Sequence, residues 1–418
     1  MRELLEMGPL DRPLTRTASL GVVTSLFRRF HAEEIPYCNW KSNEHLDASM
    51  LGDTDFDLLV DPRAALPVAG ILSQMDVKRF VVAPFHQYPG VEDYVCFDRD
   101  ASRLIHLHLH YQLTVGEKWL KGYRLPWEEV VLSTRMLHER HEIYVADPNV
   151  EMLLLVARAA VKLRWRDRLL AGRRRSYFPD KVVKEFAWLA RMVEHERLLG
   201  LARPLVGEKA ARLLAEMVGP SAPSKRQLVA FRRSAEPDLA GYRTYSVWGA
   251  RPRRWLREAR TLWWWLENRY YRVPGNSSRT CPQGGVMIAV VGADGAGKSS
   301  IAKAIAEWLS QEVAVLPIAA ARHVPMRAWR ARDLGKIVIL DGWPDSEARP
   351  PDVVVRLRVA SDVAQRRRPP GPTEQPPGHV ADVQHVRYPP STRVVEIDAN
   401  QPVERVLSEA KHAVWDSV

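Results

Sequence analysis

The stretch Gly292-Ala293-Asp294-Gly295-Ala296-Gly297-Lys298-Ser299 organises the interpretation of this chain. It matches the pattern G-x-x-x-x-G-K-[ST], in which backbone N–H groups surround phosphates. The apolar run 286–291 precedes it and is typical of a buried parallel strand. Apolar residues at helical spacing follow, namely Ile301, Ile305, Trp308 and Leu309. The sequence therefore predicts a strand, a glycine-rich loop and a helix, in the order that a phosphate-binding loop requires.

The loop residues have expected roles in holding a nucleotide. The glycines permit a sharp turn, and the N-terminus of the helix adds partial positive charge where phosphates bind. We expect Lys298 to reach the β- and γ-phosphates and the Ser299 hydroxyl to ligate Mg²⁺. The predicted ATP-binding residues are Gly292, Ala293, Asp294, Gly295, Ala296, Gly297, Lys298, Ser299 and Ser300.

Length and composition indicate a folded protein of two or three domains. The chain has 418 residues, of which 46% are hydrophobic and 27% charged. No apolar run approaches the length of a membrane-spanning helix, and the N-terminus lacks the apolar core of a signal peptide. Three scattered cysteines form no disulfide or metal pattern, so a reducing, cytoplasmic location is expected. The net charge of +11 suits nucleotides, nucleic acid or an anionic membrane, or it reflects an arginine-rich composition.

Two aspartates stand on a predicted strand near the start of the chain. Asp55 and Asp57 flank Phe56, so both carboxylates are expected on one face of the strand. Such a pair suits Mg²⁺ and a nucleoside triphosphate, whereas the alternative is a solvated strand end. The next predicted strand, 104–110, places three histidines on one face. His106, His108 and His110 could bind a softer metal such as Zn²⁺, contact an anion when protonated, or simply hydrogen-bond one another.

Several segments have apolar residues at helical spacing, namely 15–31, 147–171, 182–199 and 208–218. Asp147 or Asn149 is the candidate cap for the second of them. Arg158 and Lys162 lie on that helix, either on a solvated basic face or facing a phosphate beside the aspartates. We expect loop and turn over 113–126, and a weak boundary over 221–236.

An arginine- and tryptophan-rich segment, 248–271, precedes the expected linker 274–278. Its aromatic residues are Trp248, Trp255, Trp263, Trp264, Trp265, Tyr270 and Tyr271. Three interpretations remain open: a connector packed on a neighbouring domain, a helix on an anionic membrane, or a surface that stacks on nucleic acid. The third is the least favoured.

The N-terminal part resembles the nucleotidyltransferase superfamily of the polymerase-β type. That family has a Gly-Ser turn followed by an Asp-hydrophobic-Asp-hydrophobic strand, and Lys41-Ser42 and Asp55-Phe56-Asp57-Leu58 stand at these places. The resemblance implies an α+β fold with Asp55 and Asp57 as metal ligands. The chain departs from the family by a lysine in the turn, and by histidines where a third carboxylate is usual.

Residues 284–418 resemble the thymidylate kinase branch of P-loop kinases. Asp294-Gly295 inside the loop is typical of that branch, and the segments that match its later strands and final helix are 336–341, 351–359, 394–399 and 403–415. The resemblance implies Asp341 beside Mg²⁺, and lid arginines at Arg366–Arg368. Asp341-Gly342-Trp343 replaces the family's Asp-Arg. Only 43 positions separate Lys298 from Asp341, which leaves little chain for acceptor-binding helices.

The whole chain resembles two-part bacterial proteins, many of them encoded with surface-polysaccharide genes. We expect an α/β protein with a nucleotidyltransferase-like domain, a helical appendage, a basic connector and a parallel-sheet P-loop kinase-like domain, at 1–145, 146–245, 246–283 and 284–418. The expected activity is ATP- and Mg²⁺-dependent phosphotransfer to a small nucleotide- or sugar-type acceptor. The expected catalytic residues are Lys298, Asp341 and Arg367, and the expected metal ligands are Ser299, Asp341, Asp55 and Asp57. The alternatives are a nucleotidyltransferase using Asp55 and Asp57, or a non-catalytic nucleotide-binding scaffold.

Overall fold

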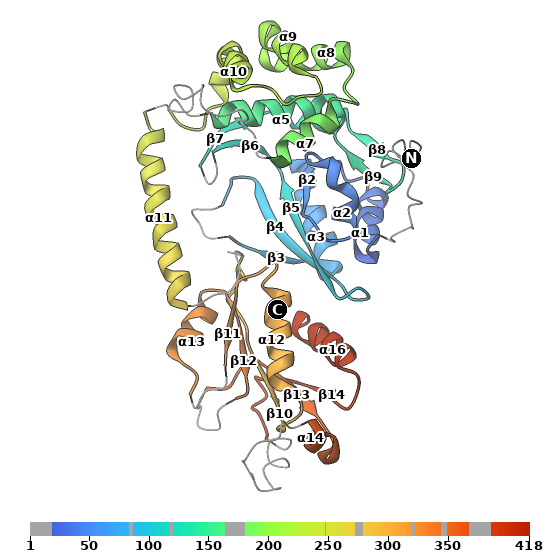
Figure 1. The fold of residues 1–418 in the computed structure, drawn as a ribbon, viewed down its shortest axis with the longest axis vertical. Helices are drawn as coiled ribbons and strands as arrows, with labels where there is room; N and C mark the ends of the chain where they lie inside the picture. The colour runs from blue at the N-terminus through green and yellow to red at the C-terminus, as the bar shows by residue number, and fades with distance from the viewer. Residues whose placement is uncertain are drawn as a thin grey trace, which may run out of the picture.

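The computed structural model describes residues 19–82, 87–117, 120–163, 180–246, 248–271, 279–319, 323–343, 349–367 and 386–418. These residues form a mixed α/β structure with two large sheets, which lie one above the other along the long axis (Figure 1). The predicted linker 274–278 and Arg368 lie outside the described residues. So does the Pro/Gly-rich segment 369–378, for which the sequence leaves open a lid over the phosphates or a disordered loop. Within the described ranges, no helix is both long enough and apolar enough to cross a bilayer.

The first sheet is mixed and has seven strands in the order β3-β4-β5-β2-β1-β9-β8. Its strands are β1 (Tyr37–Asn39), β2 (Phe56–Val60), β3 (Lys78–Phe80), β4 (Val91–Asp98), β5 (Arg103–His110), β8 (Met136–His138) and β9 (Ile143–Val145). One face packs on α1 (Gly21–Ala32) and α3 (Ala65–Gln74) through a core that includes Phe27, Phe56 and Leu107. Side chains alternate between faces along a strand, so the residues next to these core positions lie on the opposite face.

A helical layer covers the other side of this region (Figure 1). Its helices are α5 (Pro148–Lys162), α7 (Asp180–Leu189), α8 (His195–Val206), α9 (Glu208–Met217) and α10 (Lys225–Leu239). The short elements α2 (Leu46–Met50) and α4 (Glu128–Ser133) complete the first part of the chain. The predicted cap is present, because the Asp147 side chain accepts a hydrogen bond from the N–H of Asn149.

Three expectations about this helical layer are wrong. The helix predicted over 147–171 ends at Lys162, where Leu163 is extended and Arg232 donates to the carbonyl oxygens of Ala160 and Leu163, and the part predicted over 164–171 lies outside the described residues. The segment 182–199 is split between α7 and α8, because Glu194 turns to donate its N–H to the side chain of Asn149. The weak boundary at 221–236 is mostly α10, which begins with a capping box between Ser224 and Gln227.

Residues 113–126 are also not the loop and turn that the sequence suggests. They form the antiparallel hairpin of β6 (Leu113–Glu117) and β7 (Leu120–Leu125). Leu113, Val115 and Leu125 are buried in the same core as α5. Burial against that helix therefore overrides the weak strand pattern of a segment that is interrupted by glycine and charged residues.

The second sheet is fully parallel and has five strands in the order β11-β12-β10-β13-β14. Its strands are β10 (Met287–Gly292), β11 (Val315–Ile318), β12 (Ile337–Asp341), β13 (Val353–Arg358) and β14 (Arg393–Asp398). Its helices are α12 (Lys298–Leu309), α13 (Met326–Asp333), α14 (Ser361–Arg367) and α16 (Val403–Trp415). The strand–loop–helix order predicted around Lys298 is confirmed, and β10 is the central strand.

The two sheets are joined by a shared apolar cluster. Phe97 of β4 packs on Trp308 of α12 and on Trp415 of α16, with ring centroids 5.1 and 5.8 Å apart. A bridge between Val81 and Thr280 adds backbone hydrogen bonds across the same junction. A long helix, α11 (Ala250–Tyr271), runs along the outside of the molecule beside this junction (Figure 1).

Candidate functional site

The glycine-rich loop leaves the end of the central strand β10 and leads into α12. Gly295 and Gly297 have φ of +89° and +88°, a conformation that side chains rarely adopt. A Cβ atom on Gly295 would collide with the carbonyl oxygen of Ala364, and one on Gly292 would lie 2.7 Å from the carbonyl oxygen of Leu357. The loop therefore depends on glycine both for its conformation and for its close approach to β13 and α14.

A cavity of about 810 Å³ opens at this loop. Its walls are Asp294, Gly295, Ala296, Gly297, Lys298, Ser299, Ser300, Ile301, Arg367, Ala399, Gln401, Pro402, Val403 and Val406. This volume is within the range of pockets that hold small ligands. Seven of the nine predicted ATP-binding residues therefore line one cavity at the N-terminus of a helix.

Lys298 holds its ammonium group within the loop. Its Nζ atom lies 3.0 Å from the carbonyl oxygen of Ala293 and 3.0 Å from Oδ1 of Asp294. Arg367, at the end of α14, lines the cavity, and its Nη1 atom donates a hydrogen bond of 2.7 Å to the carbonyl oxygen of Ala399. The two predicted cations, which are 69 positions apart in the sequence, thus border the same cavity.

Asp341 is the last residue of β12, the strand beside β10. It pairs in register with Val290, two residues before Gly292, and its side chain is partly exposed. Ser299 lines the cavity, whereas Asp341 does not belong to the cavity walls that the described residues form. The structure therefore places Asp341 on the neighbouring strand, at the edge of the sheet from which the loop departs.

The predicted aspartate pair of the first sheet lies beside the row of histidines. Asp57 receives three cationic or N–H contacts: Lys41 Nζ at 2.8 Å, His108 Nδ1 at 3.2 Å and His110 Nε2 at 3.4 Å. Burial works against ionisation, yet Lys41, His108 and His110 hold the pKa of Asp57 well below its usual range. Asp57 is therefore a largely buried anion, with a side chain 16% exposed, whose charge the protein itself compensates.

Asp55 belongs to a second cluster at the junction of the two sheets. Its Oδ2 atom lies 3.1 Å from Nδ1 of His106, whose Nε2 atom lies 2.8 Å from Oδ1 of Asp93. Arg279 reaches this cluster from the second part of the chain, with Nη2 2.9 Å from His106 Nδ1 and Nη1 2.7 Å from Glu312 Oε2. Burial opposes it, but the hydrogen bonds with Asp55 and Asp93 raise the pKa of His106.

These clusters contain two groups of side chains that could hold a metal ion, Asp57 with His108 and His110, and Asp55 with His106 and Glu312. The ligand atoms of each group lie within 4.8 Å of one another. Imidazole combined with carboxylate suits Zn²⁺ better than Mg²⁺, which prefers an all-oxygen set. The pair expected to hold Mg²⁺ is thus divided between two groups, with Lys41 against the first and Arg279 against the second.

A small cavity of about 90 Å³ adjoins Asp57. It is lined by Trp40, Lys41, Tyr88, His108, His110, Thr114, Val115, Gly116, Lys121, Arg158 and Lys162. Four of these residues have a buried polar atom without a hydrogen-bond partner among the described residues: Trp40 Nε1, His110 Nδ1, Thr114 Oγ1 and Arg158 Nη1. Burial and the nearby lysines lower the pKa of Lys121 to about 7. Such excess positive charge, together with unused donors, suits a small anion or ordered water.

The sequence left two positions open for Arg158 and Lys162, a solvated basic face or a phosphate site beside the aspartates, and it gave no indication of Lys121. The only available signal for the first two was their spacing of four residues on one helix. Lys121 lies on β7, in the hairpin that was predicted as a loop, so no strand periodicity pointed to it.

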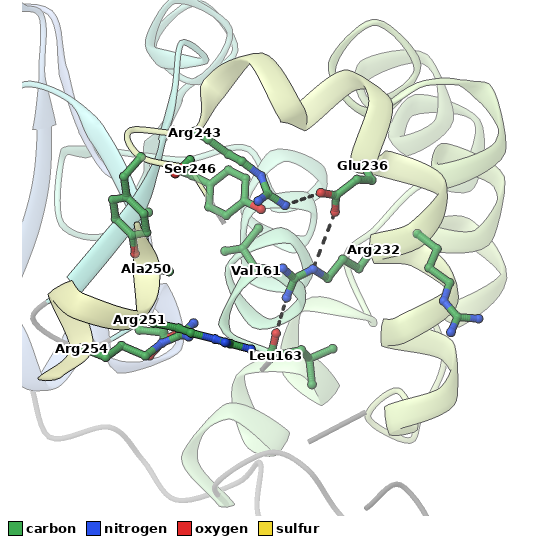
Figure 2. Close-up of a pocket in the computed structure, with 15 residues that line it drawn as sticks. Val161, Leu163, Arg232, Glu236, Arg243, Ser246, Ala250, Arg251 and Arg254 are labelled. Carbon is green, nitrogen blue, oxygen red and sulfur yellow. Dashed lines mark hydrogen bonds and ion pairs between the residues drawn. The ribbon is translucent and has the colours of Figure 1, made fainter. Parts of the chain in front are cut away.

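A larger cavity, of about 520 Å³, lies between the hairpin, the end of α5, α10 and the start of α11. Its walls contain five arginines and two glutamates: Arg232, Arg233, Arg243, Arg251, Arg254, Glu117 and Glu236. Figure 2 shows arginine side chains reaching into this pocket from α10 on one side and from the start of α11 on the other. The excess of arginine over glutamate in its walls suits an anionic ligand. No pattern in the sequence predicted that these elements meet.

Comparisons with known proteins give little further information. No family model matches the chain, and a search of curated proteins finds no match. Among solved structures, the chain is similar to the crystal structure of JHP933 from Helicobacter pylori, with 10% sequence identity and a TM-score of 0.21. The similarity covers 53% of this chain and 90% of that one. A TM-score this low does not establish a shared fold.

Proposed function

We propose that the chain is an ATP- and Mg²⁺-dependent phosphotransferase of the P-loop kinase type, with ATP bound at the 292–300 loop. The observation that carries this proposal is the cavity of about 810 Å³ at the N-terminus of α12, which the loop shares with Lys298, Ser299 and Arg367. Backbone N–H groups at a helix N-terminus favour phosphate, and positive-φ glycines allow the backbone to approach it closely.

In this proposal each named residue has a separate task. Lys298 moves from its contacts with Ala293 and Asp294 to the β- and γ-phosphates, and Arg367 offsets charge that develops on the transferred group. Ser299 and Asp341 would hold Mg²⁺, which would supply positive charge against the phosphates of ATP. The acceptor binds outside the loop, and the first part of the chain is the candidate for holding it.

The loop supports this activity better than Asp55 and Asp57 support nucleotidyl transfer. Asp57 is already neutralised by Lys41 at 2.8 Å, and Asp55 lies in a different group with His106 and Glu312. Two Mg²⁺ ions would have to displace these resident partners. A nucleotide-binding scaffold without transfer is therefore the main competitor to the kinase proposal.

Equilibrium binding of Mg·ATP tests the nucleotide site. Lys298→Ala removes a charged contact worth about 1.5–3 kcal/mol, so the affinity is expected to fall roughly tenfold to a hundredfold. Lys303→Ala, one turn farther along α12 in an exposed pair with Glu307, is the matched control and should leave the affinity unchanged. Equal affinity in both variants would refute the assignment.

Transfer of labelled γ-phosphate to a panel of nucleotides and sugars then separates the kinase from the scaffold. The kinase proposal expects transfer that is lost in Arg367→Ala, because this change removes the cation opposite the loop. Tight ATP binding without transfer to any acceptor, and without hydrolysis, would favour the scaffold instead.

A further inference from the structure

The helix α11 differs from the other helices described in the way it meets the rest of the protein. It has 22 residues and runs along the outside of the molecule, beside the junction of the two sheets (Figure 1). Two ion pairs join the first half of α11 to the hairpin: Arg254 Nε lies 2.9 Å from Glu117 Oε1, and Arg257 Nη1 lies 3.4 Å from Glu117 Oε2. The helix is therefore held to the hairpin by charges rather than by an apolar core.

The side of α11 that faces the body can be identified from burial. Arg254, Arg257, Thr261 and Trp264 are partly covered, and they recur at the spacing of one helical face. A helix of an ordinary globular protein directs its apolar stripe to this side. Here three of the four covered positions are polar or charged.

The opposite side of α11 is apolar and exposed. Trp255, Leu262 and Leu266 lie one above another at spacings of seven and four residues, and Leu256 and Trp263 lie next to them. The exposed fractions are 81% for Trp255, 72% for Trp263 and 58% for Leu262. A continuous stripe of this size facing water marks a surface that another apolar phase covers.

Exposed arginines border this stripe on both sides. By helical position, Arg251 and Arg269 lie along one border and Arg253 and Arg260 along the other. The Arg269 guanidinium lies over the ring of Trp265, 5.4 Å from its centroid. Tryptophans and leucines between two rows of arginines match the boundary between acyl chains and anionic headgroups.

We propose that α11 binds an anionic lipid surface, with the Trp255–Trp263–Leu266 stripe in the headgroup and acyl boundary and the bordering arginines on lipid phosphates. A second copy of this chain fits the surface less well, because pairing two identical helices would place the four bordering arginines of one copy near the four of the other, and like charges repel. The lipid surface supplies both the apolar phase and the opposite charge. This attachment is independent of nucleotide binding at the loop.

Vesicle cosedimentation of the full chain tests the proposal. We expect binding to vesicles of equimolar phosphatidylcholine and phosphatidylglycerol, and much weaker binding to phosphatidylcholine alone. Arg260→Gln with Arg269→Gln should reduce binding to the anionic vesicles by about fivefold per arginine. Trp255→Ser with Trp263→Ser should remove binding to both kinds of vesicle.

The matched control is Leu66→Ser, an apolar residue on α3 that is 86% exposed and distant from α11 in the sequence. It should bind vesicles as the wild type does. Circular dichroism and the midpoint of thermal unfolding check that the variants fold. We expect them to fold, because the changed side chains are exposed. Unchanged binding after the tryptophan changes would overturn the proposal. A wild-type dimer that these changes convert to a monomer, without any vesicle binding, would overturn it too by assigning the stripe to a second copy.

Discussion

The Nζ atom of Lys41 lies 2.8 Å from Oδ1 of Asp57, so a lysine neutralises the carboxylate that the sequence marks as a metal ligand. Two neighbouring strands set this distance, since the N–H of Trp40 donates to the carbonyl oxygen of Asp57 at 3.0 Å. Lys41, in the turn after β1, therefore compensates the charge of Asp57 on β2, and the pairing of the two strands holds the lysine in position.

Lys41→Met should destabilise the protein by up to about 3 kcal/mol, because removing this partner leaves the largely buried Asp57 carboxylate without its nearest cation. Urea titration at neutral pH measures the change in the free energy of unfolding. Lys303→Met is the control, since its partner Glu307 is exposed and the expected change is below about 0.5 kcal/mol. Similar small losses in both variants would show that the histidines alone neutralise Asp57.

Gly295→Ala should abolish the proposed ATP binding, because the new Cβ would require φ to leave +89° and would meet the carbonyl oxygen of Ala364. Gly200→Ala is the matched change in the exposed part of α8, where a Cβ meets nothing within 4 Å. It should leave ATP binding intact and stabilise the protein by up to about 1 kcal/mol. Calorimetric titration and urea unfolding report the two effects. ATP binding retained in Gly295→Ala would contradict the geometry described for the loop.

The parallel sheet was largely predictable, because its central strands are buried on both faces. The continuous apolar run 286–291 indicates such a strand directly. The segments 351–359 and 403–415, which the resemblance to P-loop kinases implies, contain β13 and α16, and the bounds of α16 are those expected. The hairpin β6–β7 and the helix α10 were missed. Their stability comes from burial against α5, which no local pattern reveals.

The candidate sites were predictable only where their residues are close in the sequence. Alternation along β5 correctly put the three histidines on one face beside Asp55 and Asp57. It could not indicate that Arg279 and Glu312, about two hundred positions later, join the same cluster. Such contacts depend on how the two sheets dock, and the docking is decided by dispersed apolar residues such as Phe97.

Glu151 should make the stability of the protein fall as pH rises from about 5 to 8. Burial, opposed by hydrogen bonds from Asn43 and reinforced by Glu185, raises the pKa of Glu151 to about 8. The unfolded chain ionises this carboxyl near pH 4.5, so the folded state binds the extra proton and its stability is lost as the pH approaches 8.

Glu151→Gln should therefore reduce the pH slope of the free energy of unfolding by up to about 1.4 kcal/mol per pH unit. Glu44, whose pKa is raised to about 7 chiefly by burial, maintains a slope of the same sign over a narrower pH range. Urea titrations near pH 5 and pH 8 measure this slope, with the exposed Glu307→Gln as control. An unchanged slope in Glu151→Gln would mean that this carboxyl is ionised in the folded protein.

Arg279→Met should weaken the junction between the two sheets. The Arg279 guanidinium lies between Glu312 at 2.7 Å and Asp93 at 3.3 Å, and both carboxylates are largely buried. Without the guanidinium, His106 is the remaining cationic partner of Asp93 and Glu312, which are both largely buried. The expected loss in the free energy of unfolding is therefore about 3 kcal/mol at pH 8. The loss should shrink as the pH falls, because burial already raises the pKa of Glu312 and a protonated Glu312 no longer needs a cation.

Arg99→Met is the matched control, since Arg99 also bridges the two parts of the chain, through Asp416 of the C-terminal segment, but in an exposed pair. Exposed pairs contribute little, so the expected loss is below about 1 kcal/mol and nearly independent of pH. Urea unfolding of both variants near pH 5 and pH 8 separates the two arginines. If Arg279→Met cost no more than Arg99→Met at pH 8, then the apolar contacts of Phe97 with Trp308 and Trp415 would hold the junction by themselves.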